Sequence, residues 1–597
     1  MRINKIEPPF WFADMNCRSL QLLVYGEGLT DVKVKTGFAA KCDVVHSNNG
    51  YAIVELYMND NVECKEYSIE FTNGSERLQW GYPIYPRRNK SIKGLTPQDV
   101  IYLIMPDRFA RVGQKTMCQE RQIRDVDRKK PDAWHGGNMK GVKEHLDYLA
   151  DLGVTSLWLT PVLRNNKNPE RNVFTKSEYA FYHGYAITDF YNIDEHFGNL
   201  DDYCDLVDAT HQKGLKVIKD IVFNHCGIEH PWVSCPPTDD WINHLYDVPH
   251  PISNKCTTTI FDKYASDKDK EETVCGWFTE YMPDLNLRNE YVVNYLIQMT
   301  IWWIEVADID AIRMDTYLYS DFDAMGKWLK RLDTEYPKFP VIAEIWVGDK
   351  GYVSMVQRKL LQANGSVILM DFAFQEQLEG TFSVNNKDKE LLLYRHFASD
   401  FLYEKSKSLL AFLDNHDMPR WGYTFPENLA IQKLAFGILL TIPRIPQILY
   451  GSELMLAGDG TGCSNGCMRQ DFPGGWKDDK PNLFNPVERT DEQKELFAYI
   501  KSLLHFRKGS SALTQGTMKH YIPQNGVYVY VRQYKEEKIM IMANFSDRSQ
   551  NIDLGRFKED IEKMEAFTEV VNNRRYGVTP SLMWTLKRYE IRILSNK

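Results

Sequence analysis

The stretch "IDAIRMD", Ile309 to Asp315, has the apolar pattern of a buried strand but carries two charges near its end. Side chains on a strand alternate between its two faces, so Arg313 and Asp315 share a face with Ala311. Burying a charge is costly, and a buried ion pair seldom gives more stability than an apolar pair. The two charges therefore indicate a functional position at the end of a core strand.

Similar strands repeat on both sides of this segment and alternate with amphipathic helical patterns. The predicted strands are 100–105, 154–160, 216–223, 309–315, 340–346, 366–372, 409–416 and 446–451. Eight such strands over roughly 350 residues indicate a (β/α)8 TIM barrel in the α/β class. A doubly wound open sheet is the alternative, but no glycine-rich dinucleotide fingerprint follows any strand. The long segment 226–282 after the third strand predicts an inserted subdomain.

Two β-rich regions flank the predicted barrel. Residues 1–95 show short alternating segments separated by Gly, Asn and Asp, which predicts an N-terminal immunoglobulin-like β-sandwich. The catalytic barrel, including its insertion, is expected over residues 96–507. Strand patterns such as "GVYVYVRQY" return after it, so residues 508–597 are predicted to form a C-terminal β-sandwich.

Composition argues against several classes of function. The chain has 597 residues, 43% hydrophobic and 26% charged, as is typical of a folded soluble protein. Its net charge of -9 argues against a nucleic-acid partner, because phosphate binding needs clustered Lys and Arg. No run of about 18 apolar residues predicts a membrane span. The start lacks an apolar signal core, and the eleven cysteines follow no repeating frame. These features predict a cytoplasmic protein, or a periplasmic one if the given start is truncated.

Polar residues gather at the carboxyl ends of four predicted strands, which is where such barrels place their active sites. They are Asp220, Asn224 and His225 on the third strand, Arg313 and Asp315 on the fourth, Glu344 on the fifth, and Asn415, His416 and Asp417 on the seventh. A structural ion pair or a helix cap would explain any single one of these polar residues. Unrelated structural pairs do not explain the whole set.

Two carboxylates with a supporting third indicate glycoside hydrolysis. A retaining enzyme needs a nucleophile and an acid about 5 Å apart. A neighbouring arginine favours the ionised form of a carboxylate, which suits Asp315 as the nucleophile beside Arg313. Glu344 lies between Ala343 and Ile345, an apolar setting that raises the pKa of a carboxyl group as an acid catalyst requires.

The segments "DIVFNH", "IRMD", "AEIW" and "FLDNHD" resemble, in order, the four central motifs of the α-amylase family, glycoside hydrolase family thirteen. "GVTSLWLTPV", "MPDLN" and "IPQILYGSE" resemble its three auxiliary motifs. "MPDLN", the N-terminal sandwich and the Trp after "AEI" are similar to the neopullulanase and cyclomaltodextrinase branch. "RQDFPGGW" resembles neopullulanases of the starch-utilisation type.

The resemblance implies roles for individual residues. Asp315 would be the nucleophile, Glu344 the acid/base, and Asp417 the group that holds sugar hydroxyls in the transition state. The implied substrate-binding residues are Tyr185, Asp220, His225, Arg313, Trp346, His416 and Arg469. A buried core tyrosine is the alternative for Tyr185. Arg469 and Asp471 would belong either to outer subsites or to a loop ion pair.

The implied activity is retaining hydrolysis of α-glucosidic bonds, mainly α-1,4, in starch-derived glucans such as maltodextrin, pullulan or cyclodextrin. One alternative is an α-glucan transglycosylase, because sugar as well as water can capture a covalent intermediate. Another is a non-catalytic amylase-like binding protein, but those have typically lost catalytic carboxylates. The N-terminal sandwich would bind glucan, form a homodimer or brace the barrel.

Some positions depart from the family pattern. Leu318 and Tyr319 replace a Lys-His pair that contacts the leaving-group sugar. Arg444 replaces a glycine, which predicts a rearranged entrance to the last barrel strand. No cofactor is needed for the chemistry. Relatives bind calcium after the first barrel strand through Asn and Asp residues, most of which are absent from "MPDRFARVGQKTM". Calcium needs six to eight oxygen ligands, so the metal remains an open alternative there.

Overall fold

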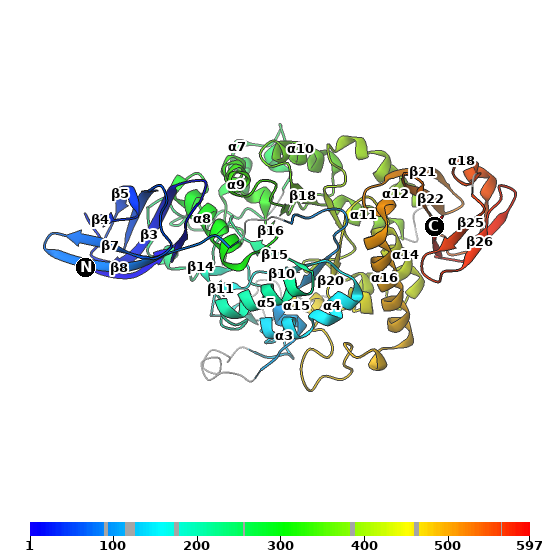
Figure 1. The fold of residues 1–597 in the computed structure, drawn as a ribbon, viewed down its shortest axis with the longest axis horizontal. Helices are drawn as coiled ribbons and strands as arrows, with labels where there is room; N and C mark the ends of the chain where they lie inside the picture. The colour runs from blue at the N-terminus through cyan, green and yellow to red at the C-terminus, as the bar shows by residue number, and fades with distance from the viewer. Residues whose placement is uncertain are drawn as a thin grey trace.

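The computed structural model describes residues 1–88, 93–113, 126–171, 178–254, 257–382, 389–458, 465–562 and 564–597. An α/β barrel lies at the centre, with one β-domain at each end of the molecule (Figure 1). Within the described ranges, every helix is too short or too polar to cross a lipid bilayer.

The central unit is a closed barrel of eight parallel strands. Each strand pairs with the next along the chain, and the last pairs with the first. The strands are β9 (Ile101–Ile104), β10 (Ser156–Leu159), β15 (Lys216–Ile221), β16 (Ala311–Met314), β17 (Val341–Ala343), β18 (Val367–Met370), β19 (Leu409–Phe412) and β20 (Ile445–Leu449). The prediction of a (β/α)8 barrel is confirmed. The strands are almost continuously apolar because helices cover their outer surface.

Amphipathic helices surround the barrel. The longer ones are α5 (Leu200–Gln212), α8 (Glu290–Ala307), α9 (Phe322–Glu335), α10 (Lys350–Leu361), α11 (Phe372–Thr381), α12 (Glu390–Ala398), α14 (Leu429–Leu439) and α16 (Asp491–Gly509). In α5 a capping box joins Asn199 and Asp202, which satisfies backbone N–H groups at the helix start. Tyr203, Leu206, Val207 and Thr210 then form the buried stripe of α5, at the spacing of three to four residues that one helix face requires.

Two long excursions leave the barrel at the carboxyl ends of its strands. The predicted one, between β15 and α8, contains the short helices α6 (Pro231–Ser234) and α7 (Asp267–Cys275). A second excursion after β10 was not predicted. In it β11 (Leu163–Asn165) pairs with β14 (Ile187–Ile193), and β12 (Glu170–Arg171) pairs with β13 (Glu178–Tyr179). Two of these strands are only two residues long, too short for a periodic pattern.

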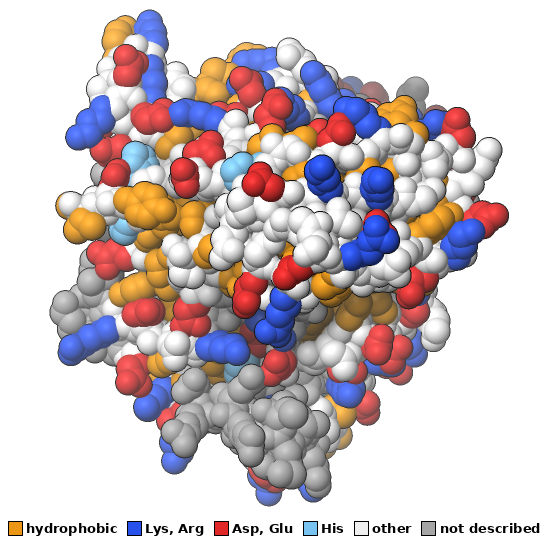
Figure 2. All heavy atoms as spheres, turned by 90° about the vertical axis from the view of Figure 1, so that its left-hand side faces the viewer, with side chains coloured by type: hydrophobic (Ala, Val, Ile, Leu, Met, Phe, Trp, Pro, Cys, Tyr) orange, Lys and Arg blue, Asp and Glu red, His pale blue; other side chains and the backbone are white. Residues whose placement is uncertain are grey.

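The N-terminal domain consists of two four-stranded sheets, ordered β1-β3-β6-β5 and β2-β8-β7-β4. Their strands are β1 (Arg2–Glu7), β2 (Trp11–Phe12), β3 (Ser19–Glu27), β4 (Lys33–Thr36), β5 (Ala39–Ser47), β6 (Tyr51–Met58), β7 (Glu66–Asn73) and β8 (Glu76–Tyr85). Strand β3 packs on α8, where Gln21 N donates to Gln298 Oε1 at 2.7 Å. Figure 2 looks onto this end of the molecule and shows acidic and basic side chains mixed over the face.

The C-terminal domain packs against α14, α16 and α12. Its six-stranded sheet is ordered β21-β22-β23-β28-β25-β26, and β24 pairs with β27. The strands are β21 (Thr517–Gln524), β22 (Val527–Tyr534), β23 (Glu537–Asn544), β24 (Gln550–Asp553), β25 (Ala566–Glu569), β26 (Arg575–Gly577), β27 (Met583–Leu586) and β28 (Ile591–Ser595). A separate hydrophobic cluster that includes Val529, Met542 and Leu594 forms its core. The expected β-rich domains at both ends are therefore confirmed.

The entrance to β20 keeps regular pairing despite Arg444. Strand β20 pairs in register with both β19 and β9, so no rearrangement accompanies the replaced glycine. The fully buried guanidinium of Arg444 donates from Nε to Asp371 Oδ2 at 2.9 Å and from Nη2 to Asp400 Oδ1 at 2.8 Å. Arg444 thus links the ends of β18 and α12 to β20.

We expect Arg444→Met to lower the free energy of unfolding by about 3–5 kcal/mol, because it leaves the buried Asp371 carboxylate without its cation. The variant is compared with the parent by denaturant unfolding. Arg548→Met is the matched control, since Arg548 is 85% exposed and its ion pair with Asp547 is long, at 3.9 Å. Equal unfolding midpoints for the Arg444 variant and the parent would contradict this account.

Candidate active site

The parallel register of neighbouring strands brings the predicted carboxylates together. Asp220 on β15 lies opposite Arg313 on β16. Asp315 follows β16 directly, and its backbone N–H donates to Ile221 O at 2.9 Å. Glu344 follows β17, and its N–H donates to Met314 O at 3.1 Å. Each acid is therefore fixed by strand pairing at the same end of the barrel.

The buried guanidinium of Arg313 contacts three carboxylates. Its Nη1 donates to Asp315 Oδ1 at 2.6 Å and to Asp220 Oδ1 at 3.0 Å. Its Nη2 lies 2.6 Å from Glu344 Oε1. Asp315 and Glu344 are each 6% exposed, so both carboxyl groups are almost completely shielded from solvent. This arrangement explains the two charges at the end of the "IDAIRMD" strand.

Burial and charge set the protonation of the two central acids. Burial raises the pKa of Asp315 to about 6, although Arg313 partly offsets it. Burial raises the pKa of Glu344 further, to about 7. Arg313 forms the expected ion pair with Asp315 and by itself lowers the pKa of that carboxyl group. Burial raises this pKa by more, so the net shift is upward. Glu344 is therefore the better proton donor of the two, and Asp315 ionises first.

Tyr185, His416 and Asp417 lie together beside these carboxylates. The Tyr185 hydroxyl donates to Asp220 Oδ2 at 2.9 Å and lies 2.7 Å from His416 Nε2. The Tyr185 and His416 rings stack with centroids 5.6 Å apart. Arg469 Nη2 donates to Asp417 Oδ1 at 2.8 Å. Burial alone would raise the pKa of Asp417, but the positive charges of Arg469 and Arg313 hold it below its ordinary value, so this carboxylate stays ionised.

These side chains surround a cavity of about 660 Å³. Of the site residues predicted from the sequence, the cavity is lined by Tyr185, His225, Asp315, Glu344, Trp346, Asp417 and Arg469. Asp220, Arg313 and His416 are buried and contact the lining residues. The structure therefore brings all ten predicted site residues together.

Aromatic side chains flank the carboxylates, and the sequence reasoning found only some of them. Trp346 is 43% exposed and stacks on Phe372 with centroids 4.9 Å apart. His225 stacks on Phe278, at 5.2 Å, and Phe278 contacts Tyr319 edge-on. Phe278 was not predicted, because it lies in the insertion outside any motif. Leu318 and Tyr319, which replace the family's Lys-His pair, also line the cavity.

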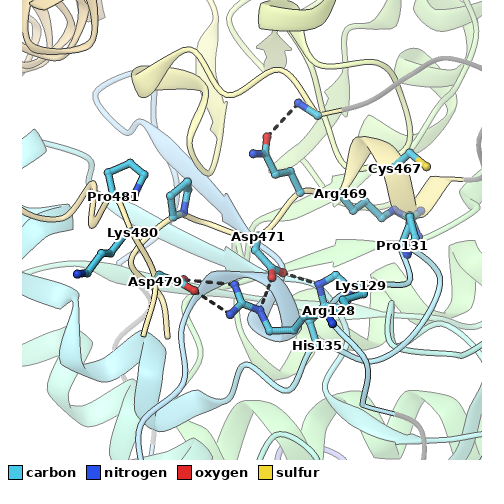
Figure 3. A pocket seen from close by; sticks show the side chains of 14 residues that line it. Arg128, Lys129, Pro131, His135, Cys467, Arg469, Asp471, Asp479, Lys480 and Pro481 are labelled. Atoms are coloured by element: carbon cyan, nitrogen blue, oxygen red, sulfur yellow. Dashed lines mark hydrogen bonds and ion pairs between the residues drawn. The ribbon is translucent and has the colours of Figure 1, made fainter. Parts of the chain in front are cut away.

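A second cavity of about 540 Å³ is lined mainly by the loop after β20, and it shares Arg469 with the catalytic cavity. Arg128 closes one side: its Nε donates to Asp471 Oδ2 and its Nη1 to Asp479 Oδ1, both at 2.7 Å (Figure 3). The guanidinium also lies 4.0 Å from the Trp476 ring centroid. His135 Nδ1 is 2.6 Å from Asp471 Oδ1. Asp471 thus contacts Arg128 and His135, whereas Arg469 pairs with Asp417, and a role of Asp471 in an outer subsite stays a prediction.

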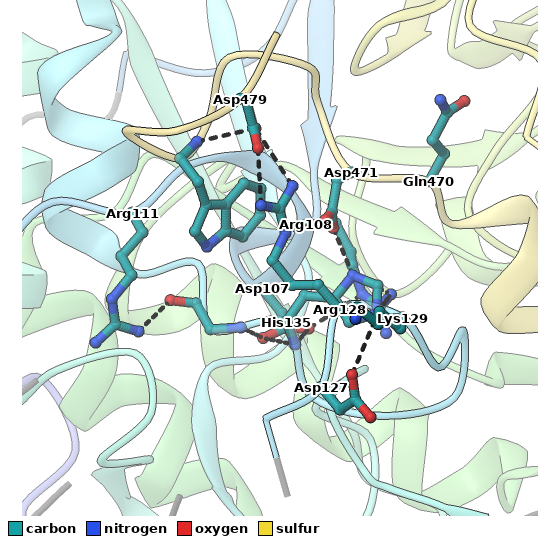
Figure 4. Close-up of polar contacts among 12 residues, drawn as sticks. Asp107, Arg108, Arg111, Asp127, Arg128, Lys129, His135, Gln470, Asp471 and Asp479 are labelled. Atoms are coloured by element: carbon teal, nitrogen blue, oxygen red, sulfur yellow. Dashed lines mark hydrogen bonds and ion pairs between the residues drawn. The ribbon is translucent and has the colours of Figure 1, made fainter. Parts of the chain in front are cut away.

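The loop after β9, for which the resemblance raised a calcium site, is held in place by hydrogen bonds within the protein. Within residues 105–113 Asp107 is the one carboxylate, and residues 114–125 lie outside the described ranges. His135 N and Gly136 N donate to Asp107, and Arg108 Nε lies 3.0 Å from Asp107 Oδ2 (Figure 4). Among the described residues this donor set does not fit a calcium ion, and the rest of the calcium prediction falls on residues 114–125, outside the described ranges.

We expect Trp346 to contribute to substrate binding and not to the rate of the chemical step. Its exposed ring face lines the cavity, and aromatic faces pack well on the C–H faces of sugars. We expect Trp346→Ala to raise KM for maltoheptaose by about tenfold and to leave kcat almost unchanged. Trp346→Phe keeps a flat ring and should retain most of the affinity. An unchanged KM in the alanine variant would contradict this role.

Comparison with known proteins agrees with this geometry. The family model "Alpha amylase, catalytic domain" matches residues 103–516. "Cyclomaltodextrinase, N-terminal" matches residues 5–88, and "Cyclo-malto-dextrinase C-terminal domain" matches residues 518–595. These three matches coincide with the barrel and its two flanking β-domains.

Named relatives have similar length and moderate identity. The chain is 26% identical to the cyclomaltodextrinase of Thermoanaerobacter pseudethanolicus over 87% of both proteins. It is 25% identical to neopullulanase 2 of Thermoactinomyces vulgaris, covering 80% of this chain and 75% of that protein.

Among solved structures, an Anoxybacillus α-amylase superposes with a TM-score of 0.67 at 27% identity, covering 84% of this chain and 98% of that one. Because the catalytic-domain model alone matches well over half of the sequence, on the barrel that carries the three carboxylates, the chain belongs to the α-amylase family of glycoside hydrolases.

Proposed function

We propose that this enzyme is a retaining hydrolase of α-glucosidic bonds, mainly α-1,4, in starch-derived glucans. The observation that carries the proposal is the contact of Asp315 and Glu344 with the two terminal nitrogens of one guanidinium. Shared contact with Arg313 keeps the two carboxyl groups close, and a short separation of about 5 Å is typical of retaining glycosidases. Relatives named cyclomaltodextrinase and neopullulanase support the substrate class.

In the first step, the ionised Asp315 attacks the anomeric carbon of the bound sugar. Glu344 donates its proton to the glycosidic oxygen as the bond to the leaving sugar breaks. Asp417, held ionised by the Arg469 guanidinium, binds hydroxyls of the same sugar unit. The product of this step is a glycosyl ester of Asp315.

In the second step, water attacks the anomeric carbon of the ester. Glu344, now ionised, takes a proton from that water, and Asp315 leaves as a carboxylate. Two displacements at one carbon restore the original configuration. The buried, neutral rings of His225 and His416, in each of which burial lowers the pKa to about 3, serve as hydrogen-bonding groups rather than as proton carriers.

The stereochemistry of the fresh product tests this proposal. NMR of a maltodextrin digest should show the α anomer first, before mutarotation produces the β anomer. Appearance of the β anomer first would contradict a retaining mechanism. Hydrolysis of maltodextrin, pullulan and cyclodextrin side by side then identifies the preferred substrate.

Transglycosylation is the second candidate, because the glycosyl ester can react with a sugar hydroxyl instead of water. Trp346 and Tyr319 line the same cavity as Asp315 and Glu344, so an acceptor sugar would have aromatic side chains to contact there. Chromatography of products at high maltotriose concentration separates the two outcomes. Products longer than the substrate indicate transfer, and shorter products alone indicate hydrolysis.

Location and assembly complete the proposal. A cytoplasmic location is supported by a relative from Bacillus subtilis named intracellular maltogenic amylase, 25% identical over 79% of this chain. A homodimer remains a prediction, which light scattering on the purified protein tests. The proposed partner is the glucan substrate, with no nucleic acid or membrane involved.

A further inference from the structure

One side of the catalytic cavity is apolar, and hydrolysis of a glucan does not by itself explain why. This apolar wall comes from the segments that follow three neighbouring barrel strands, β15, β16 and β17. Its side chains are Phe278, Met282, Leu318, Tyr319 and Trp346. In the closed ring of eight strands, β15 lies opposite β19 and β16 lies opposite β20. Asp417 and Arg469 follow β19 and β20, so they line the cavity across from the apolar wall.

The apolar wall lies beside the acid/base. Thr316, directly after the nucleophile, has a left-handed backbone with φ of 44°, which turns the chain sharply into Leu318 and Tyr319. The Thr316 N–H donates to Glu344 Oε2 at 2.8 Å, and Trp346 follows Glu344 by two residues. A group that exchanges a proton with Glu344 must lie within hydrogen-bond reach of it. The group that leaves or enters at the anomeric carbon therefore meets the apolar wall.

The polar side chains on this side of the cavity already have partners within the protein. Tyr319 Oη donates to Asn254 Oδ1 at 3.2 Å, and Thr257 Oγ1 donates to Trp346 O, also at 3.2 Å. The Thr279 hydroxyl accepts from a backbone N–H at 3.3 Å. Apart from the two catalytic carboxylates, no described lining residue from the segments after β15, β16 and β17 is charged at neutral pH. A ligand with many hydroxyls would therefore find few free partners here.

The chemistry of the apolar wall favours an aromatic ring over a sugar ring. Each sugar hydroxyl that is buried must replace its hydrogen bonds with water, and the free-energy cost is large where partners are lacking. An aromatic ring has no such requirement, because burial against apolar groups stabilises it and ring edges pack well on ring faces. Phe278 and Tyr319 already contact edge-on, with centroids 5.3 Å apart, so an aromatic ligand would extend an existing cluster.

We propose that the enzyme transfers glycosyl units to aromatic alcohols in preference to sugars, and that Leu318 and Tyr319 determine this acceptor specificity. The activity rests on the proposed function, because it begins from the same glycosyl ester of Asp315. Glu344, as a carboxylate, takes the proton of the alcohol hydroxyl while the alcohol oxygen bonds to the anomeric carbon. The ester bond breaks, and Asp315 leaves as a carboxylate. The product is an α-glycoside of the aromatic alcohol.

Competition between two acceptors for one glycosyl ester tests the preference. The donor is α-maltosyl fluoride, because the fluoride ion that leaves is too small to fill the apolar wall. With benzyl alcohol and glucose at equal concentrations, chromatography should show about ten times more benzyl α-maltoside than transfer product on glucose. Transfer to glucose that equals or exceeds transfer to benzyl alcohol would overturn the inference.

Substitutions in the apolar wall should remove the preference. Leu318→Lys adds a hydrogen-bond donor for sugar hydroxyls, and Tyr319→Ala removes a ring, so each should lower the ratio of benzyl to glucose product by about tenfold. Leu318 is 2% exposed, so thermal unfolding checks the fold of the Lys variant, and the half-buried Tyr319 provides the second variant. Tyr264→Ala, which removes an 84% exposed tyrosine outside the cavity, is the matched control and should keep the parent ratio. A folded Tyr319→Ala variant with the parent ratio would contradict the assigned specificity.

Release of fluoride separates this inference from the proposed function. A fluoride electrode follows the first step with α-maltosyl fluoride, before any acceptor reacts. Absence of fluoride release would refute the proposed function, because no glycosyl ester forms. Normal fluoride release without a preference for benzyl alcohol would overturn the acceptor specificity alone.

Discussion

Replacing Asp315 by Asn is expected to lower kcat on maltodextrin by about 10⁴-fold or more. The amide has no charge with which to attack the anomeric carbon, so no glycosyl ester forms. The fold should persist, because Asn has nearly the same shape and Arg313 keeps its contacts with Asp220 and Glu344. A reducing-sugar assay measures the rate, and thermal unfolding checks the fold.

The control for this prediction is Asp151→Asn, which makes the same change at a 59% exposed surface ion pair. It should leave the rate unaltered. If the Asp315 variant keeps a rate within about tenfold of the parent, Asp315 is not the nucleophile. Another carboxylate on Arg313, Asp220 or Glu344, would then have to take that role.

The sequence predicts the barrel and its catalytic carboxylates because both depend on local patterns. "IDAIRMD" shows an apolar strand and the charges at its end within seven residues, and β15, β17 and β19 repeat that form. Strands with this pattern close into a barrel, and closure alone brings their carboxyl ends to one rim. Asp220, Arg313, Glu344 and Asp417 could therefore be placed before any coordinates.

Features that depend on contacts distant in sequence were not predicted. Arg444 finds Asp371 and Asp400 more than 40 residues away, so sequence alone suggested a disturbed strand instead of an ion pair. Phe278 reaches the active site only through the folded insertion. The pKa of Asp315 could not be predicted from the sequence either, because burial raises this pKa and Arg313 lowers it. Only the three-dimensional burial decides that balance.

Replacing Glu344 by Gln is expected to lower kcat on maltodextrin by about 10²- to 10⁴-fold, the usual contribution of a general acid. The leaving sugar then departs without a proton. A leaving group that is a weak base, as in a nitrophenyl maltoside, needs little protonation in order to depart. The rate of the first step with such a substrate should therefore fall much less. Asp315→Asn should instead be inactive on both substrates. Equal losses on both substrates in the Gln variant would contradict the acid role of Glu344.

The pH profile provides an independent test of the same assignment. The raised pKa of Glu344, about 7, means that this acid keeps its proton up to that pH and loses it above. Asp315, with a pKa of about 6, becomes ionised above that pH and is protonated below. Both groups are in their active forms between about pH 6 and 7, so kcat/KM of the parent should peak there and fall on either side.

Each limb of the profile should respond to a different substitution. With the nitrophenyl maltoside, Glu344→Gln removes the titrating acid, so the fall above about pH 7 should disappear while the fall on the acid side remains. The low pKa of Asp417 keeps it ionised across the whole window, so it contributes to neither limb. An alkaline limb that persists in the Gln variant would mean that another group titrates there. Glu344 could then not be the proton donor that its burial beside Arg313 indicates.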